Sequence, residues 1–570
     1  MLKTKHYDFD AIVVGSGISG GWAAKELTEK GMKVLVLERG KDLKHGSGYI
    51  GEHTPSWKFP FNAKANRPVE EEIYEVQGKV YAFRAANMHF WNNDKDNPYA
   101  MDEGKPFDWF RGDVVGGKSL MWGRQAYRLS QQDFEANAKD GIAIPWPVTY
   151  DEIAPWYSYV EKFIGVNGKK EGLPQLPDGE FQKPMPWYAV EETIHGRLKE
   201  NAPDITLTNA RTAILTEHLP GRAACHYCGP CENGCSTGSY FSSLSSTLPA
   251  AKATGNLTLK SDMVVERLEY DAETGKISKV HAINTKTMQP VAFSARVYFL
   301  CASTVASTQI LLNSACKEFP DGLANSSGAL GSYLMDHFNS AGAAGLFDDN
   351  SDTYYLGNRP AGLYIPRFRN VGENDEDNGF IRGYGFQTTI NSGSWVDGFN
   401  EKGFGANLKQ KLTNIKPVWS FYATGFGECL PQERNKISLS KTKKDRFGIP
   451  QVVFDFEWSE NEKAMAKDML KQGERILNAA GAKYSVTFGD TENLSIPGSG
   501  IHEMGTARMG DDPTKSVLNK FNQAHDVANL FVTDGSFMVS SSCVNPSLTY
   551  MAFTARACDY AVKQMHSGLI

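Results

Sequence analysis

The sequence predicts an α/β protein, α+β overall, in which a Rossmann-like dinucleotide-binding domain is joined to a domain built on a mainly antiparallel sheet. Three observations lead to this class. The 570 residues are too many for a single hydrophobic core. The chain opens with an apolar strand, a glycine turn, a helix and a second strand. The stretch from about 342 to 497 is rich in Gly, Asn and aromatic residues and contains alternating segments, which indicate antiparallel strands.

Local patterns place the other elements along the chain. After the first βαβ unit the pattern is irregular to about residue 108, and a second glycine-rich turn follows at 115–123. Residues 257–265, 278–284 and 291–300 are interpreted as a strand meander. The remaining predicted elements are strands at 9–14, 33–37, 451–456 and 530–534, and helices at 21–30, 150–164, 304–312 and 548–564.

The first glycine turn, Gly15-Ser16-Gly17-Ile18-Ser19-Gly20, has the spacing of a dinucleotide site. Its glycines allow a tight turn, a close approach of backbone to pyrophosphate and close packing of helix on strand. The helix N-terminus then faces the phosphates, and Ser19 lies within this turn. Glu38 ends the second strand, where a carboxylate can accept hydrogen bonds from ribose hydroxyls. The turn predicts a dinucleotide but does not separate FAD from NAD.

Composition and charge exclude several classes. A formal charge of −6 gives no electrostatic reason to bind nucleic acid. No apolar run approaches the ~18 residues that a membrane helix needs. The first ten residues have neither a basic nor an apolar segment of a signal peptide, so we expect a cytoplasmic protein unless a partner subunit carries it across a membrane.

Four of the nine cysteines lie in one short run, Cys225-x2-Cys228-x2-Cys231-x3-Cys235. Such spacing lets successive thiolates converge on one iron–sulfur cluster. In ferredoxins the fourth Cys of a run of this kind serves another cluster, so Cys225, Cys228 and Cys231 are the safer ligands. Cys235, or a remote residue such as Cys429 or Cys543, would complete a 4Fe–4S site, and a 3Fe–4S cluster needs none of them. Structural zinc and disulfides are the alternatives.

Several motifs together resemble the glucose–methanol–choline (GMC) oxidoreductases, and the match runs nearly end to end. The second turn, Gly116-Gly117-Lys118-Ser119, is similar to the turn that passes the flavin in that family. The other matching motifs are the segment 302–312, the "GxxLxDH" stretch 331–337, His502-Glu503-Met504-Gly505-Thr506, Thr533-Asp534-Gly535-Ser536 and Asn545-Pro546-Ser547-Leu548-Thr549.

The resemblance implies FAD as the cofactor and alcohol oxidation as the reaction, with His502 and Asn545 as the catalytic pair at flavin N5. A neutral His is a suitable base near pH 7, and an Asn amide can orient the alkoxide oxygen. His337 is expected to have a structural role. The family resemblance also implies contacts with FAD for a further set of residues: Gly116, Gly117, Ser119, Val264, Asp534, Gly535, Pro546 and Thr549.

Covalent attachment of FAD through a His occurs in some members of the family. The corresponding position here is Leu120-Met121, neither of which can form that bond. We therefore expect non-covalent FAD.

The cysteine run and the lack of a signal peptide resemble the large subunits of bacterial sugar dehydrogenases within the family. The resemblance implies oxidation of C3 of a glucoside or disaccharide to the 3-keto sugar, a small partner subunit with an export signal, a cytochrome c or quinone acceptor, and a periplasmic location. A gluconate 2-dehydrogenase or another polyol dehydrogenase is the alternative, and a non-catalytic flavin electron-transfer subunit is a third. Side chains proposed for sugar contacts, which a packed sheet would also use, are Trp395, Trp419, Tyr422, Gln387 and Asn391.

Domain boundaries follow from these assignments. Residues 1–55, 106–148, 215–340 and 498–570 are assigned to the FAD-binding domain, with the cysteine run 225–235 inserted in it. Residues 56–105, 149–214 and 341–497 are assigned to the substrate-binding domain and lid segments.

Overall fold

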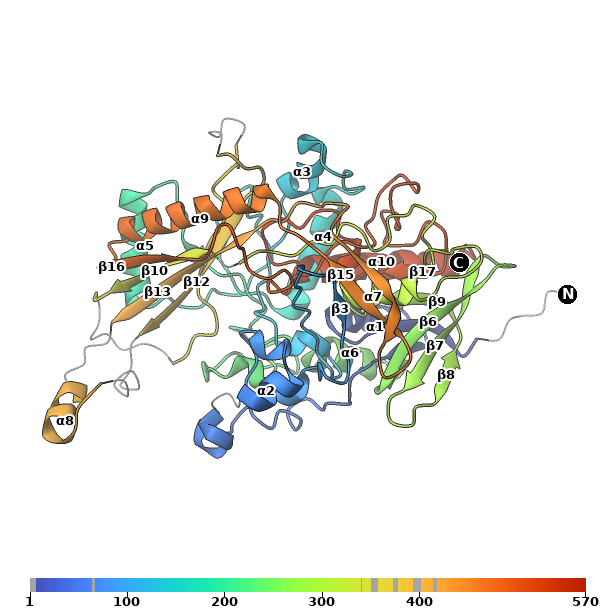
Figure 1. Ribbon diagram of the computed structural model, residues 1–570, viewed down its shortest axis with the longest axis horizontal. Coiled ribbons are helices and arrows are strands. Elements are labelled where there is room, and N and C mark those ends of the chain that lie inside the picture. The colour runs from blue at the N-terminus through green and yellow to red at the C-terminus, as the bar shows by residue number, and fades with distance from the viewer. Residues whose placement is uncertain are drawn as a thin grey trace.

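The computed structural model describes residues 7–63, 67–339, 341–349, 357–372, 378–392, 401–413 and 418–570. A parallel sheet and a larger antiparallel sheet lie toward opposite ends of the long axis in Figure 1. The predicted class, a Rossmann-like half joined to a half with a mainly antiparallel sheet, is confirmed.

The parallel sheet has five strands in the order β17-β9-β1-β2-β5. Its strands are β1 (Phe9–Val14), β2 (Val34–Leu37), β5 (Leu257–Lys260), β9 (Ala295–Leu300) and β17 (Leu530–Val532), and all of them run parallel. Helices α1 (Ile18–Glu29), α6 (Thr247–Ala253) and α10 (Ser547–His566) pack with it. Because β1, β2, β9 and β17 are covered by other elements, they have nearly continuous apolar sequences.

The predicted βαβ unit at the N-terminus is confirmed. Helix α1 begins at Ile18, three residues before the predicted start, directly after Gly17. Trp22 and Leu27 are fully buried, as the helical pattern predicts. The backbone of Gly31 has φ +83°, a left-handed conformation that ends the helix at little cost for a glycine.

The predicted strand meander is wrong in two places. The run 257–265 is broken by Asp262, whose φ of +60° separates β5 from β6 (Met263–Asp271). The run 291–300 divides between β8 (Pro290–Phe293) and β9. Only β6, β7 (Lys276–Asn284) and β8 form the antiparallel meander, while β5 and β9 belong to the parallel sheet.

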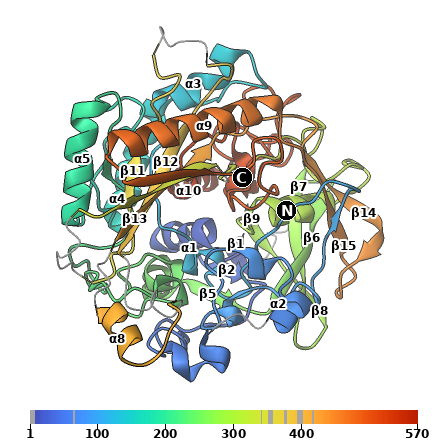
Figure 2. The same cartoon turned by 60° about the vertical axis from the view of Figure 1, so that its left-hand side comes forward.

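The larger sheet has six strands, and the pairings between them are antiparallel. In order they are β16 (Tyr484–Phe488), β10 (Gly342–Phe347), β13 (Trp419–Gly427), β12 (Tyr384–Ser392), β11 (Leu363–Ile365) and β4 (Thr208–Asn209). Helix α9 (Glu460–Ala479) lies across it, with α5 (Ala189–Asn201) beside α9 (Figure 2). Burial alternates along β13, so one face of the sheet packs against these helices and the other face is more open.

The remaining elements connect these two halves. The predicted strand at 451–456 is present as β15 (Pro450–Asp455), but it pairs with β14 (Lys436–Lys444) and β3 (Ala100–Met101) in a separate small sheet. The other helices are α2 (Arg67–Ile73), α3 (Gln131–Asp140), α4 (Tyr150–Ile164), α7 (Thr304–Leu312) and α8 (Gly405–Thr413). Among the helices in the described part of the chain, none has the length and apolarity needed to cross a bilayer.

Candidate functional site

The predicted dinucleotide residues gather at the carboxyl edge of the parallel sheet. Gly15 follows β1, Glu38 follows β2 and Asp534 follows β17. The carboxyl ends of neighbouring parallel strands share one edge, which is where ligands of open α/β sheets bind. The structure therefore brings together residues that are more than 500 positions apart in sequence.

The glycines of the first turn have different surroundings. A Cβ on Gly15 would lie 2.4 Å from the carbonyl oxygen of Cys301, and one on Gly20 would lie 2.0 Å from that of Gly15. A Cβ on Gly17 would have no protein atom closer than the carbonyl oxygen of Gly116, at 3.9 Å. Gly15 and Gly20 are thus required by packing, whereas Gly17 faces open space.

The second glycine turn lies opposite that space. A Cβ on Gly117 would lie 3.8 Å from the Cα of Gly17. Ser16 Oγ accepts a hydrogen bond from the N–H of Gly116 at 2.8 Å, which holds the two turns together. Ser119 Oγ donates to the carbonyl of Gly116 at 2.6 Å and so fixes the second turn. Because neither Gly17 nor Gly117 carries a side chain, a pyrophosphate at this edge can approach the backbone of the turns closely.

Glu38 lies beside the first turn and is buried. Its carboxylate accepts hydrogen bonds from the N–H and Oγ of Ser16, at 3.0 and 2.6 Å, and from the N–H of Gly40 at 2.7 Å. Burial raises the pKa of Glu38, and the bonds from Ser16 and Gly40 oppose that rise. The N–H of Met263 donates to the Glu38 carbonyl at 2.9 Å, which places Val264, also buried, close to the same strand end.

The C-terminal motifs complete this edge. Asp534 is buried and accepts bonds from the N–H and Oγ of Ser536, at 3.1 and 2.6 Å. Gly535 is enclosed by protein, since a Cβ there would lie 2.5 Å from Thr304 Oγ1. Pro546 precedes the first turn of α10. Within that turn, the hydroxyl of the buried Thr549 lies 2.8 Å from that of Tyr157.

His502 and Asn545 meet as predicted. Asn545 Nδ2 lies 3.2 Å from His502 Nε2, and Asn545 Oδ1 accepts a bond from Gln387 Nε2 at 2.7 Å. On the other side of the ring, His502 Nδ1 lies 3.0 Å from Nδ1 of His337. His502 keeps part of its surface exposed, whereas His337 is fully buried.

Backbone hydrogen bonds join two motifs that are distant in sequence and so hold this arrangement. The backbones of Met335 and Met504 exchange two hydrogen bonds of 2.9 Å. The carboxylate of Asp336 accepts bonds from the backbone N–H of Gly498, Gly500 and His502, at 2.9, 3.0 and 2.9 Å. The "GxxLxDH" stretch therefore anchors the loop that carries His502.

Burial controls the protonation of the two histidines. It lowers the pKa of His502 well below its usual 6.5, and the nearby His337 and the ammonium of Lys118 lower it further. Burial likewise lowers the pKa of His337 to about 4. Both imidazoles are therefore neutral near pH 7, which is the form that can accept a proton.

Two further features of the site were not predicted. Lys118, in the second glycine turn, forms a 2.9 Å ion pair with Glu503, next to His502 in sequence. The ring of Phe426 lies 6.2 Å from the His502 ring. The sequence offered a signal for Lys118, which lies inside a glycine motif, but none for Phe426, because its register on β13 depends on the strand pairing.

The open face of the larger sheet extends from this pair. Gln387 and Asn391 share that face of β12 by strand alternation, and Tyr422 is exposed on the neighbouring β13. Trp419 was proposed for sugar contacts, but it is buried on the opposite face, where its ring lies 5.5 Å from that of Tyr188. Trp395 lies outside the described residues.

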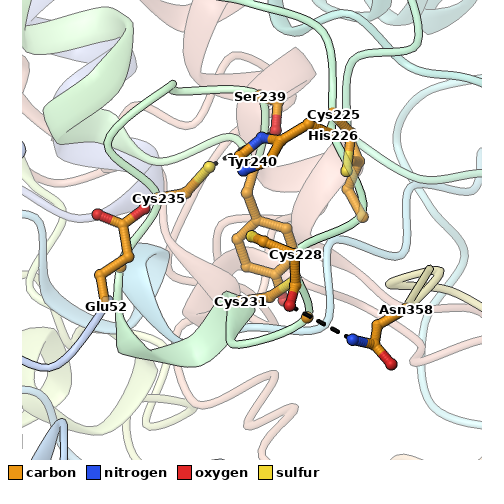
Figure 3. A pocket seen from close by; sticks show the side chains of 12 residues that line it. Glu52, Cys225, His226, Cys228, Cys231, Cys235, Ser239, Tyr240 and Asn358 are labelled. Carbon is orange, nitrogen blue, oxygen red and sulfur yellow. Dashed lines mark hydrogen bonds between the residues drawn. The ribbon is translucent and has the colours of Figure 1, made fainter. Parts of the chain in front are cut away.

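The cysteines of the run line one small cavity together with Tyr240 (Figure 3). Neither Cys429 nor Cys543 lines it. All nine cysteines are free, so the disulfide alternative is not realised in this structure. Among the described residues, no three His, Cys, Asp or Glu side chains are arranged as a preformed site for a metal ion, whether in a cluster or as zinc.

The sulfur atoms nevertheless have the surroundings of thiolate ligands. The N–H of Tyr227 lies 3.4 Å from Cys225 Sγ, and the hydroxyls of Thr237 and Ser239 lie 3.3 and 3.5 Å from Cys235 Sγ. Hydrogen bonds to the sulfur atoms are among the features that tune iron–sulfur centres. The donor set and its environment fit a cluster.

The fold and this edge define a dinucleotide-binding protein. Family models described as GMC oxidoreductase match residues 9–339 and 431–554. The chain belongs to the GMC oxidoreductase family.

Curated relatives cover nearly the whole chain. It is 30% identical over 575 residues to 2-methyl-1,2-propanediol dehydrogenase of Mycolicibacterium austroafricanum, covering 98% of this chain and 96% of the relative. It is 25% identical to the fructose dehydrogenase large subunit of Gluconobacter japonicus, covering 98% of each. It is 24% identical to the gluconate 2-dehydrogenase flavoprotein of Pantoea cypripedii, covering 96% and 92%.

A solved structure shows the same fold. The structure of an FAD-dependent oxidoreductase from Chaetomium thermophilum superposes with a TM-score of 0.62 at 14% identity, covering 98% of this chain and all of that chain. The family and the relatives, in turn, make the protein an FAD-dependent oxidoreductase that acts on alcohol or sugar-type CH–OH groups.

Proposed function

We propose that the protein is a dehydrogenase that oxidises a secondary hydroxyl of a sugar, with C3 of a glucoside or disaccharide as its target. The observation that carries the chemistry is the neutral His502, held between His337 and Asn545 beside the second glycine turn. Sugar specificity is supported by the amide and aromatic side chains on the open face of β12 and β13, and by the sugar and sugar-acid dehydrogenases among the relatives.

The protein residues bind and orient the reactants. Gly17 and Gly117 would face the pyrophosphate of FAD, Glu38 the ribose, and Asp534 and Pro546 the ribityl chain and the isoalloxazine ring. FAD, when bound, accepts the hydride from the carbinol carbon. His502 takes the hydroxyl proton, and Asn545 orients the alkoxide oxygen. Because Leu120 and Met121 cannot bond to the flavin, the FAD is held without a covalent link.

The base assignment is tested by His502→Ala. We expect this variant to keep its FAD and to lose roughly two to four orders of magnitude in turnover. Its FAD content, measured after acid precipitation, also reports whether the flavin is released. A variant with full FAD and near-normal turnover would refute the assignment, and flavin retained in the precipitate would refute non-covalent binding.

We further propose that Cys225, Cys228, Cys231 and Cys235 hold an iron–sulfur cluster, 3Fe–4S or 4Fe–4S, in preference to zinc. Buried charge supports an anionic centre here. Arg124 and Arg222 are buried, and within the described residues their guanidinium groups donate only to backbone carbonyls and form no ion pair. Burying a guanidinium without an ion pair is costly. Glu232 lies near Arg124, and cluster-bound thiolates at Cys231 and Cys235 would add negative charge beside both arginines.

The cysteine cavity lies close in the chain to the glycine turns. Tyr240 lines the cysteine cavity, and three residues later Ser243 donates to the carbonyl of Ser16 at 2.8 Å and accepts from, or donates to, Ser119 Oγ at 2.9 Å. Three extended residues span at most ~10 Å. A cluster held by the cysteine run would supply a one-electron exit toward a cytochrome c or quinone, typical of a dehydrogenase and not of an oxidase.

Elemental analysis and EPR test the cluster. We expect three or four iron atoms with matching sulfide per chain, and their loss in Cys228→Ser, whereas Cys316→Ser, which lies outside the run, retains them. Zinc in place of iron would refute the cluster. Rapid oxygen consumption with stoichiometric peroxide would refute the dehydrogenase assignment.

The assembly and the division into domains are part of the same proposal. We propose a small partner subunit that carries an export signal and a periplasmic location; in support, the relative from Gluconobacter japonicus is named a large subunit. We propose the same bounds for the FAD-binding and substrate-binding segments as those assigned from the sequence. The alternatives are a polyol or sugar-acid dehydrogenase, which product analysis separates, and a non-catalytic electron-transfer subunit, which would show no flavin bleaching by any sugar.

A further inference from the structure

His337 lies directly behind His502, and every polar atom of its ring has a partner. The two rings are 5.0 Å apart and nearly perpendicular, at 77°. Nε2 of His337 lies 2.8 Å from the carbonyl oxygen of Ser542 and 3.4 Å from that of Ser541. Its Nδ1 lies 3.0 Å from Nδ1 of His502.

These contacts determine where the protons are. Carbonyl oxygens can only accept hydrogen bonds, so Nε2 of His337 must carry its proton. A neutral imidazole has a single N–H, so Nδ1 of His337 is a bare acceptor. The short contact between the two Nδ1 atoms then requires His502 to donate from Nδ1.

The same logic continues to Asn545. With its proton on Nδ1, neutral His502 has a free lone pair on Nε2. The atom of Asn545 near it is Nδ2, a donor, and Asn545 Oδ1 is held by the amide of Gln387. Only one set of proton positions therefore satisfies every hydrogen bond from the Ser542 carbonyl to Gln387.

We infer that His337 is a positioning residue that keeps the His502 proton on Nδ1 and thereby presents Nε2 as the base. This inference rests on the proposed function, in which His502 accepts the hydroxyl proton. The alcohol O–H bond breaks as its proton passes to Nε2, and the imidazolium that results still donates from Nδ1 to His337. His337 never touches the substrate. It acts by excluding the tautomer in which Nε2 is already protonated.

Two matched substitutions separate this role from a structural one. In His337→Asn, Oδ1 takes the place of the ring Nδ1 and can accept from His502, while the bond to Ser542 is lost. In His337→Gln, the amide takes the place of Nε2 and keeps the bond to Ser542, but the acceptor for His502 is lost. A catalytic imidazole in the wrong tautomer costs up to ~10⁴-fold in turnover.

The measurement is the rate of anaerobic flavin reduction at saturating substrate, with FAD content and thermal midpoint recorded for each holoenzyme. We expect His337→Asn to stay within about tenfold of the parent, and His337→Gln to fall at least about a hundredfold with little change in half-saturating substrate. Equal rates, or a faster Gln variant, would overturn the inference, because a structural role favours the variant that keeps Ser542.

His502→Ala distinguishes the two levels of failure. If that variant reduces its flavin at the parent rate, the proposed base is wrong and the tautomer argument fails with it. If it is inactive while the Asn and Gln variants of His337 behave alike, the base stands and only the role of His337 is refuted.

Discussion

Replacing Gly17 with alanine separates cofactor binding from folding. The backbone at Gly17 is extended, with φ −69° and ψ −153°, and a methyl group there would meet no protein atom within 3.8 Å. The apoprotein should therefore fold normally, with a change in unfolding free energy between zero and a gain of ~1 kcal/mol from the stiffer unfolded chain. The methyl group would cover the bare backbone of the first turn, where the pyrophosphate is expected.

The expected effect on FAD is large. Because the methyl group prevents the backbone from approaching the pyrophosphate closely, FAD should bind at least a hundredfold more weakly. This corresponds to about 2.8 kcal/mol of binding free energy, at ~1.4 kcal/mol per decade. Binding to the native state adds stability in proportion to the logarithm of ligand concentration over Kd. FAD should therefore raise the thermal midpoint of the parent far more than that of Gly17→Ala. The assay is a melting curve of each apoprotein with and without added FAD.

Two other glycines provide the controls. Gly196, on α5, has no neighbour within 4 Å of a built Cβ, so Gly196→Ala should keep both folding and FAD binding. Gly20→Ala places a methyl group 2.0 Å from the Gly15 carbonyl, so it should lower stability by several kcal/mol even without FAD. A folded Gly17→Ala that binds FAD like the parent would refute the placement of the pyrophosphate against the first turn.

Two more predictions concern the reacting groups. Lys118→Met removes a positive charge that disfavours protonated His502 and leaves Glu503 unpaired, and both changes raise the pKa of His502. The acidic limb of the kcat/KM profile should therefore move to higher pH, and a limb that stays or moves lower would contradict the assignment of His502 as base. Tyr422→Ala should raise KM for glycosides about tenfold with little change in kcat, because the exposed ring lies on the open sheet surface. The control Tyr484→Ala, on the edge strand β16, should change neither parameter. Equal effects of the two substitutions would argue against a sugar contact at Tyr422.

The first turn could be predicted from sequence because all of its signals are local. A short apolar strand, three spaced glycines and an acid at the end of the next strand occur within 38 residues. Helices α4 and α7 were placed at their exact bounds, Tyr150–Ile164 and Thr304–Leu312, for the same reason. Local periodicity is sufficient when an element is bounded by caps and turns.

Sheet membership could not be predicted in the same way. The break at Asp262 is a single left-handed residue, and Asp carries only a weak signal for that conformation. The run 291–300 was interpreted as one strand of the meander, because a short and mostly apolar run does not reveal where a strand ends or which strands pair with it. Long-range pairing with β1 and β17 decides its place.

The candidate site shows the same division. Resemblance to a family brought out His502 and Asn545, and Gln387 was proposed for a sugar contact. The bond between Gln387 and Asn545 and the place of Phe426 depend on sheet register, which no local pattern gives. The sugar contact proposed for Trp419 was wrong, because side chains alternate along β13 and Trp419 lies on the core face, opposite to the exposed Tyr422. His337 was expected to be structural, and its contact with His502 became visible only once the two motifs lay side by side.

The central claim, hydride transfer from a sugar carbinol with His502 as base, is tested most directly by anaerobic flavin reduction with a glucoside deuterated at C3. The account predicts that the glucoside bleaches the flavin, that deuterium slows the bleaching several-fold, and that the product is the 3-keto sugar. Bleaching without an isotope effect at C3, with a product oxidised elsewhere, would contradict the assigned position. Flavin that stays oxidised with every sugar would contradict the proposed sugar dehydrogenase activity.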